Sequence, residues 1–279
     1  MNEIPRYELL DGHSIPPVGF GTYPLRGEDA ATAVASALSL GYRLVDSAVN
    51  YKNEDAVGRG ISQSGVPRNE IVVTTKLPGR HHGYDQTIES FQRSRSALNV
   101  ETVDLYLIHW PNPSVGKFVE SWRAMIQLQQ DGLITSIGVS NFTEEFLIRL
   151  QDETAVLPSV NQIEMHPYFP QSQLRAVHDR LGIRTQSWSP LGRGRELLTE
   201  AAIVEAAAFH RVSAAQVVLR WQLQLGAVPI PKSQDPVRQR ENLEVFGFDL
   251  DDGEMQAISA LGRPDGRITG ADPNTHEEM

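Results

Sequence analysis

The sequence predicts an α/β fold in which eight parallel strands alternate with helices and close into a (β/α)8 TIM barrel. Three observations lead to this prediction. Short β-type runs alternate with longer helical segments from residue 18 onward. Several of the runs are apolar throughout, as expected for strands that are covered on both faces. The strand ends recur at an average spacing of roughly 30 residues, which matches about 250 residues divided among eight β/α units.

Eight segments have the length and composition of strands. They are Val18–Phe20, Leu44–Asp46, Ile71–Lys76, Asp104–His109, Ser136–Ser140, Ser159–Gln162, Arg184–Ser189 and Ala227–Ile230. Apolar residues recur at helical spacing in five stretches, which are Glu28–Leu40, Gln86–Leu98, Phe118–Gln130, Gln171–Leu181 and Ser213–Leu225. Gly41, Gly182 and Gly226 each follow such a stretch directly. Glycine accepts the left-handed conformation, so it is the residue expected just past a helix.

A doubly wound dinucleotide-binding sheet is the alternative arrangement of the same elements. That fold needs the pattern G-x-G-x-x-G between its first strand and first helix. The nearest match is GFGTYP at Gly19–Pro24, where proline replaces the third glycine. No acidic residue follows a second strand at the expected distance, so the barrel is favoured.

We expect residues 1–279 to form one domain, with a β-hairpin at residues 7–15 that closes the bottom of the barrel. Asp11-Gly12 lies there between two short runs, and Asp-Gly is a strong signal for a two-residue hairpin turn. Residues 263–279 form a polar C-terminal tail. The beginning of this tail is a candidate to fold over the opposite end of the barrel and tune the choice of substrate.

The composition limits the classes of function. The 279 residues include no cysteine and carry a formal net charge of −10, which excludes thiolate chemistry and argues against nucleic-acid or anionic-membrane partners. The first ten residues, MNEIPRYELL, lack the apolar core of a signal peptide, and no apolar run approaches the roughly 20 residues that span a bilayer. A cytoplasmic protein is expected, and nothing calls for more than a monomer.

Polar side chains gather at the carboxyl ends of the predicted strands, which meet on the catalytic face of such a barrel. The residues there are Asp46, Lys76, His109, Trp110, Ser140, Asn141, Gln162, Trp188, Ser189, Lys232 and Ser233. Taken singly, most have an ordinary structural explanation: an aspartate caps a helix, and a histidine or tyrosine packs in a core. Lys76 is harder to explain in this way, because a lysine at the end of a core strand is rarely left unpaired. Their joint order along the chain favours a functional site.

Four of these groups suggest proton transfer to a carbonyl oxygen. The phenol of Tyr51, on the loop after the second strand, ordinarily has a pKa near 10. A lysine ammonium close by, Lys76, is expected to lower that pKa by roughly 1–3 units. Asp46 would keep Lys76 charged and fixed, and His109 would orient the same oxygen by a hydrogen bond. General acid catalysis of this kind is typically worth about 10²–10⁴ in rate.

The electrons must come from a cofactor, and no flavin or metal signature appears in the sequence. Lys232, Ser233 and Arg238, with Arg240 nearby, form a basic patch on an acidic chain. Such a set suits a phosphate monoester, so the 2′-phosphate of NADPH would fit there. Trp188 is placed to stack on a nicotinamide ring.

Three ordered motifs at this point resemble those of the aldo-keto reductases, and the resemblance covers essentially the whole chain. They are GYRLVDSAVNYKNE at Gly41–Glu54, TVDLYLIHWP at Thr102–Pro111 and the pattern IPKS–R–EN within Ile230–Asn242. Within that superfamily the compact loops and the tryptophan at 188 are most similar to the bacterial 2,5-diketo-D-gluconate reductases. Leu77 and Arg193 stand where those reductases often carry tryptophan and glutamine, and both positions bear on the substrate.

The resemblance implies NADPH-dependent reduction of aldehydes or ketones, on small carbonyl substrates such as methylglyoxal or keto-sugar acids, with no metal. It implies a catalytic tetrad of Asp46, Tyr51, Lys76 and His109, with Tyr51 as proton donor. The implied cofactor-binding residues are Thr22, Ser140, Asn141, Gln162, Trp188, Ser189, Leu191, Lys232, Ser233, Arg238, Glu241 and Asn242. The resemblance implies that Tyr23 borders the substrate. Trp110 is a second candidate for that position, because it directly follows His109 at a strand end.

Two other functional classes remain open on the sequence. A regulatory or channel-associated protein could keep the barrel and the tetrad as a nucleotide sensor, although no additional partner-binding segment is evident. A barrel isomerase or aldolase would use Lys76 as a Schiff-base nucleophile, which needs a neutral lysine. His81-His82 invites a metal site, but no nearby acidic or histidine partner completes one, and a loop bordering the substrate is favoured.

Overall fold

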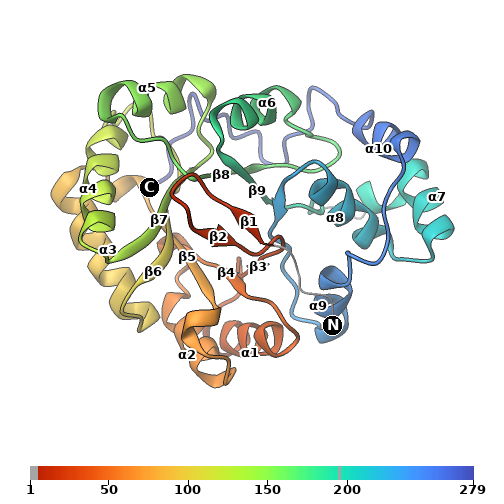
Figure 1. The fold of residues 1–279 in the computed structure, drawn as a ribbon, viewed down its shortest axis with the longest axis horizontal. Coiled ribbons are helices and arrows are strands. Elements are labelled where there is room, and N and C mark those ends of the chain that lie inside the picture. The colour runs from red at the N-terminus through yellow and green to blue at the C-terminus, as the bar shows by residue number, and fades with distance from the viewer. Residues whose placement is uncertain (1–5, 194–195) are drawn as a thin grey trace.

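The computed structural model describes residues 6–193 and 196–279. Within them, eight parallel strands form one sheet in the order β10-β9-β8-β7-β6-β5-β4-β3. Backbone hydrogen bonds join the two outer strands, from Gly19 N to Pro229 O at 3.0 Å and from Gly21 N to Pro231 O at 2.9 Å. The sheet is therefore closed, with its helices arranged around it (Figure 1). The predicted (β/α)8 barrel is confirmed.

Each of the eight predicted strand segments overlaps a strand. The strands are β3 Phe20–Gly21, β4 Leu44–Asp46, β5 Val72–Leu77, β6 Val103–Ile108, β7 Ile134–Ser140, β8 Val160–Glu164, β9 Arg184–Trp188 and β10 Val228–Pro229. Every residue of β4, β5 and β8 is buried. These strands contact barrel interior on one face and helices on the other, which explains why their sequences do not alternate.

The helices form the outer ring, and all five predicted helical stretches are confirmed. The helices are α1 Gly27–Ser39, α2 Glu54–Gln63, α3 Tyr84–Leu98, α4 Phe118–Gln130, α5 Glu144–Thr154, α6 Ser172–Leu181, α7 Ala201–His210, α8 Ala214–Gln224, α9 Pro236–Leu243 and α10 Asp252–Ser259. Gly41, Gly182 and Gly226 have positive φ values of 113°, 72° and 76°. They end α1, α6 and α8 in the left-handed conformation, as the sequence predicts.

Helix α2 is missing from the five helical stretches given from the sequence, because Gly58 and Gly60 weaken the helical signal. Both glycines allow close packing. A Cβ atom at Gly58 would lie 2.4 Å from the carbonyl oxygen of Leu98 at the end of α3. A Cβ atom at Gly60 would lie 2.5 Å from the carbonyl oxygen of Ala31 in α1. Helix α2 is therefore held by tertiary packing that requires residues without side chains.

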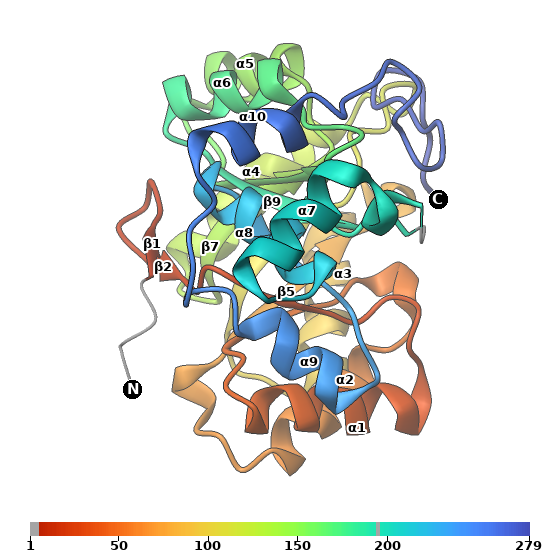
Figure 2. The same ribbon diagram turned by 90° about the vertical axis from the view of Figure 1, so that its right-hand side faces the viewer.

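The N-terminal hairpin consists of β1 Tyr7–Glu8 and β2 Ser14–Ile15, which pair antiparallel. Its Leu9 and Ile15 are buried in one cluster with residues of the barrel strands, including Leu105. The hairpin lies at the end of the barrel away from the C-terminal segment (Figure 2). The predicted two-residue turn is wrong: Leu9 N bonds to His13 O at 2.8 Å, so three residues form the turn, with Gly12 at φ +82°.

In the part of the chain that is described, no single helix is long and apolar enough to cross a membrane. Helices α7 and α8 reach the required length and hydropathy only as a pair, and they are bent by 96° at the break between them.

Candidate active site

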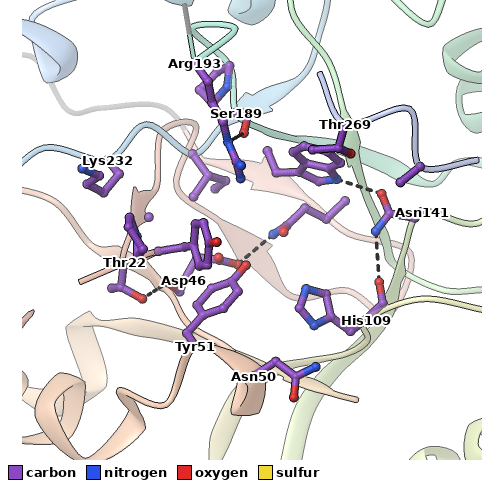
Figure 3. A pocket seen from close by; sticks show the side chains of 18 of the residues that line it. Thr22, Asp46, Asn50, Tyr51, His109, Asn141, Ser189, Arg193, Lys232 and Thr269 are labelled. Atoms are coloured by element: carbon purple, nitrogen blue, oxygen red, sulfur yellow. Dashed lines mark hydrogen bonds between the residues drawn. The ribbon is translucent and has the colours of Figure 1, made fainter. Parts of the chain in front are cut away.

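The carboxyl ends of the barrel strands open into a cavity of about 910 Å³ (Figure 3). Many of the residues singled out from the sequence line it. They are Thr22, Tyr23, Asp46, Tyr51, His109, Trp110, Asn141, Gln162, Trp188, Ser189, Leu191 and Lys232. The strand-end rule thus locates the cavity correctly.

A buried ion pair lies beside this cavity, and one of its members, Asp46, lines it. Lys76, from β5, has no exposed surface, and its Nζ lies 2.7 Å from Asp46 Oδ2 at the end of β4. The ammonium also donates to the carbonyl oxygen of Ser47 at 2.8 Å. Asp46 Oδ1 accepts a hydrogen bond from Gln162 Nε2 at 2.7 Å. Both charges therefore have several polar partners, which a buried pair needs in order to offset its lost hydration.

Tyr51 brings its hydroxyl to the same ammonium. It ends a short 3-10 turn, Val49–Tyr51, that follows β4. Lys76 Nζ donates to the Tyr51 hydroxyl oxygen at 3.3 Å and lies 4.9 Å from the centre of its ring. One lysine therefore contacts both the carboxylate and the phenol, with no other residue between them.

The expected direction of the Tyr51 pKa is wrong. Burial raises the pKa of Tyr51 more than the neighbouring Lys76 lowers it, so the net pKa lies above its usual value. The side chain is partly buried and lines the cavity. Burial would by itself lower the pKa of Lys76, whereas Asp46 and Tyr51 together raise it above the ordinary value. At neutral pH the site therefore holds a neutral phenol beside an ammonium ion.

His109 follows β6 and lies beside Tyr51, with 5.7 Å between the two ring centres. Its backbone is fixed by Asn141, whose Nδ2 donates to His109 O at 3.0 Å. The phenol and the imidazole thus border the same part of the cavity. An oxygen atom placed between them would meet the phenol hydroxyl and a nitrogen of the imidazole.

A set of amide and hydroxyl groups forms the wall on the β7 to β9 side. Asn141 has a φ of +63°, a conformation in which asparagine is enriched, and its Oδ1 accepts from Trp188 Nε1 at 2.8 Å. Ser140 Oγ donates to the carbonyl oxygen of Gln162 at 2.8 Å. The Gln162 side chain also donates to Gln186 Oε1 at 3.0 Å. The bond to Asn141 fixes the orientation of Trp188 at the edge of the cavity.

Thr22 and Ser189, which are predicted to bind the cofactor, are held by hydrogen bonds to neighbouring segments. Thr22 bonds to β4, and Ser189 bonds within the loop that follows β9. Thr22 is fully buried, and its hydroxyl donates to the carbonyl oxygen of Asp46 at 2.9 Å. Ser189 has a φ of +50°, and its Oγ accepts from Arg193 Nε at 2.9 Å. Leu191 is half-buried on the same loop.

The predicted basic patch lies on the loop after β10 and on α9. Lys232 is exposed and lines the cavity, whereas Ser233, Arg238, Glu241 and Asn242 lie outside its lining. Arg238 has 76% of its side chain exposed, 3.8 Å from Asp235. Ser233 Oγ accepts from Asp235 N at 3.1 Å. Asn242 is buried and Glu241 is half-buried on α9.

Comparison of the sequence with known protein families identifies the family of this chain. The family model described as "Aldo/keto reductase family" matches residues 17–263. The chain belongs to the aldo/keto reductase family. It is therefore an oxidoreductase, and the resemblance inferred from its motifs is confirmed.

Relatives and solved structures of the same family match nearly the whole length of this aldo/keto reductase. It is 54% identical over 279 residues to 2,5-diketo-D-gluconic acid reductase B of a Corynebacterium species, with both chains covered completely. A crystal structure of a mutant of Gox0644 in complex with NADPH superposes with a TM-score of 0.94 at 46% identity, covering 99% of this chain and all of that one. A Bombyx mori aldo-keto reductase in complex with NADP gives 0.88 at 33%, covering 94% of each.

The cavity of this aldo/keto reductase also contains residues that the sequence did not single out. Asn50, Gln186, His276 and Glu278 contact the predicted site residues or line the cavity. Glu278 Oε1 lies 2.8 Å from His109 Nδ1. Asn50 could have been identified from the sequence, because it directly precedes Tyr51 within the first motif. Glu278 carried none, because it lies far along the chain in a polar tail.

Proposed function

We propose that this aldo/keto reductase reduces aldehydes or ketones to alcohols with NADPH, with Tyr51 as the general acid. The observation that carries the proposal is the buried Lys76 ammonium, which contacts Asp46 at 2.7 Å and the Tyr51 hydroxyl at 3.3 Å. The NADPH-bound relative at 46% identity supports the choice of cofactor.

The residues around the cavity fit such a cofactor. Trp188 presents a partly exposed ring at the cavity edge, suited to stacking on the nicotinamide. Ser140, Asn141 and Gln162 would hold the carboxamide, while Ser189 and Leu191 would approach the pyrophosphate. Exposed Lys232 and Arg238, with Ser233, would bind the 2′-phosphate by charge-assisted hydrogen bonds. The remaining assigned contacts are Thr22 at the ribose and Glu241 and Asn242 at the adenine.

The chemistry of the chain's own residues follows from their protonation. When bound, the nicotinamide supplies a hydride to the carbonyl carbon. The oxygen gains negative charge as that bond forms, and the neutral phenol of Tyr51 donates its proton to it. Lys76, held charged by Asp46, stabilises the phenolate that remains. His109 donates a hydrogen bond that orients the oxygen toward Tyr51.

Substrates in this proposal are small carbonyl compounds such as methylglyoxal or keto-sugar acids. The identity to a diketogluconic acid reductase supports the second group. Tyr23 and Trp110 line the cavity and would border the substrate. A Schiff-base role for Lys76 is not favoured, because its pKa is raised and the amine stays protonated. The cytoplasmic location and the monomeric state stay predictions from the sequence.

The test compares two tyrosines of the same cavity. NADPH oxidation is followed by absorbance with methylglyoxal as substrate. Tyr51→Phe removes the hydroxyl on Lys76 and should lower kcat by about 10²–10⁴. Tyr23→Phe removes a hydroxyl from the neighbouring ring, 5.1 Å away between centres, and should change kcat by less than about tenfold.

NADPH binding, measured by fluorescence quenching, should be retained in both variants. Turnover that survives Tyr51→Phe would contradict the assignment of the proton donor. Failure of the wild-type chain to bind NADPH would contradict the choice of cofactor.

A further inference from the structure

The final residues of the chain form part of the wall of the cavity. Glu278 lines it, with only 15% of its side chain exposed. Its Oε1 lies 2.8 Å from His109 Nδ1 and accepts a hydrogen bond from Asn50 Nδ2 at 2.5 Å. A carboxylate from the C-terminal tail therefore lies beside the histidine that borders the reacting part of the cavity.

This carboxylate is held by contacts from several loops. Asn112 Nδ2 donates to the backbone carbonyl of Glu278 at 2.7 Å. Gly79 leaves room for that carbonyl, since a Cβ atom there would lie 2.2 Å from it. The His276 ring packs on Trp110 with 4.3 Å between the ring centres. The tail is therefore built into the wall, and its last acidic side chain has a defined place.

The charge of Glu278 differs from that of Asp46 in its partner, because His109, 2.8 Å away, is a cation only when its ring is protonated. Among the residues that the structure describes, the acidic side chains lining the cavity are Asp46 and Glu278, and Asp46 is paired with Lys76. Burial raises the pKa of Glu278, but nearby His109 and hydrogen bonds from Asn50 and Gly79 outweigh it and leave the pKa below its usual value. The contact with His109 is close without being an aligned hydrogen bond, because Nδ1 has no hydrogen-bond partner among the described atoms.

We propose that Glu278 sets the charge selectivity of the pocket: it disfavours substrates that carry a carboxylate directly beside the reacting carbonyl and favours uncharged ones. The inference rests on the proposed function, because it requires the carbonyl oxygen to lie between Tyr51 and His109. A carboxylate bonded to the carbonyl carbon would then approach that of Glu278, whose Oε1 lies 2.8 Å from His109 Nδ1. Two like charges on the order of 6 Å apart, at an effective dielectric constant near 20, repel enough to lower kcat/KM by about 10- to 100-fold.

The opposite wall of the cavity has the opposite charge. Arg193 lines the cavity, and its guanidinium lies over the Tyr23 ring at 5.2 Å. In Figure 3, Arg193 and Asn50, which holds the Glu278 carboxylate, lie on opposite sides of Tyr51. A carboxylate several carbons away from the carbonyl, as in a keto-sugar acid, can approach Arg193 instead. The selectivity therefore concerns carboxylates adjacent to the carbonyl.

The experiment compares pyruvate with methyl pyruvate, which present the same ketone with and without an adjacent charge. The ratio of kcat/KM for methyl pyruvate to that for pyruvate is measured with NADPH. Glu278→Gln should lower this ratio about 10- to 100-fold, through a gain on pyruvate. Glu277→Gln is the matched control, because Glu277 bonds to Ser114 N at 2.8 Å outside the cavity lining, and it should leave the ratio unchanged.

Binding of an unreactive analogue gives a second readout. Oxamate carries a carboxylate beside an amide carbonyl, and its inhibition constant should fall by a similar factor in Glu278→Gln. If the ratio and the inhibition constant of Glu278→Gln both stay at their wild-type values, the proposed role of Glu278 is overturned, while the proposed function is not affected. An equal loss on both ketones would also overturn it, since that pattern indicates a structural role. Absence of NADPH oxidation with methylglyoxal and with both ketones in the wild type would overturn the proposed function itself.

Discussion

At the scale of single residues, the pair of Asp46 and Lys76 shows how a buried charge is stabilised. Lys76 has no exposed surface, and it is tolerated because Asp46, the Ser47 carbonyl and the Tyr51 hydroxyl all accept hydrogen bonds from it. Its raised pKa means that the pair stabilises the fold below the ordinary lysine pKa. That contribution is lost only as the pH rises through the folded-state value, in alkaline solution.

Replacing one partner of this pair should cost more than replacing both. Lys76→Met leaves the Asp46 carboxylate buried without its cation, and the free energy of unfolding should fall by about 3–5 kcal/mol. The double variant Asp46→Asn with Lys76→Met should recover part of this loss, since no unpaired charge is left. Urea denaturation at pH 7 measures both. Equal stability of the single and double variants would show that the charge itself is not responsible.

At the scale of elements, helix α2 shows packing outweighing propensity. Gly58 and Gly60 are poor helix formers, yet each faces the backbone of a neighbouring helix at a distance that leaves no room for a methyl group. The helix follows directly on the turn that carries Tyr51. Its close contact with α1 and α3 therefore fixes the position of that turn relative to the barrel.

A methyl group at position 58 tests this account. Gly58→Ala should gain up to about 1 kcal/mol in helix propensity but lose about 1–3 kcal/mol by overpacking, because its Cβ would lie 2.4 Å from Leu98 O. The net result is a lower melting temperature in thermal denaturation. Gly253→Ala in α10 is the control: the nearest atom there is a carboxylate oxygen of Asp251 at 3.2 Å. A stabilised Gly58→Ala variant would refute the packing argument.

The contrast between what the sequence predicted and what it did not has a physical basis. The strands were predictable because burial on both faces leaves an apolar run in the sequence. Asp46, Lys76 and His109 were predictable because the barrel brings strand ends to one face. The direction of the Tyr51 pKa was not, since it depends on how much protein surrounds the hydroxyl. Glu278 was not either: it bonds to Asn112 across 166 positions, and no local pattern encodes such a contact.

At the scale of the whole molecule, two buried histidines couple stability to acidity. His178, in α6, is buried between Asn161 on β8 and Thr185 on β9, to which its ring nitrogens bond at 2.9 Å and 2.8 Å. Burial lowers its pKa to about 3. Burial likewise lowers the pKa of His82 to about 4. Both rings are neutral in the folded protein where the unfolded chain would already be protonated.

The consequence is a loss of stability in mild acid. Between pH 6.5 and about 4 the unfolded state binds more protons than the folded state, so the free energy of unfolding falls as the pH decreases. Each histidine contributes up to about 1.4 kcal/mol per pH unit. Urea denaturation from pH 7 to pH 4.5 measures the slope. His178→Gln should remove one such contribution, and an unchanged slope would contradict the assignment to His178.

The location of the last residues affects how the protein can be handled. Asn50 Nδ2 donates to the backbone oxygen of Met279 at 3.2 Å, beside the cavity that Glu278 lines. An affinity tag or fusion partner joined after Met279 would therefore emerge beside this cavity and pull on the segment that carries Glu278. The hairpin lies at the far end of the barrel (Figure 2), so a fusion placed before it keeps foreign sequence away from the cavity.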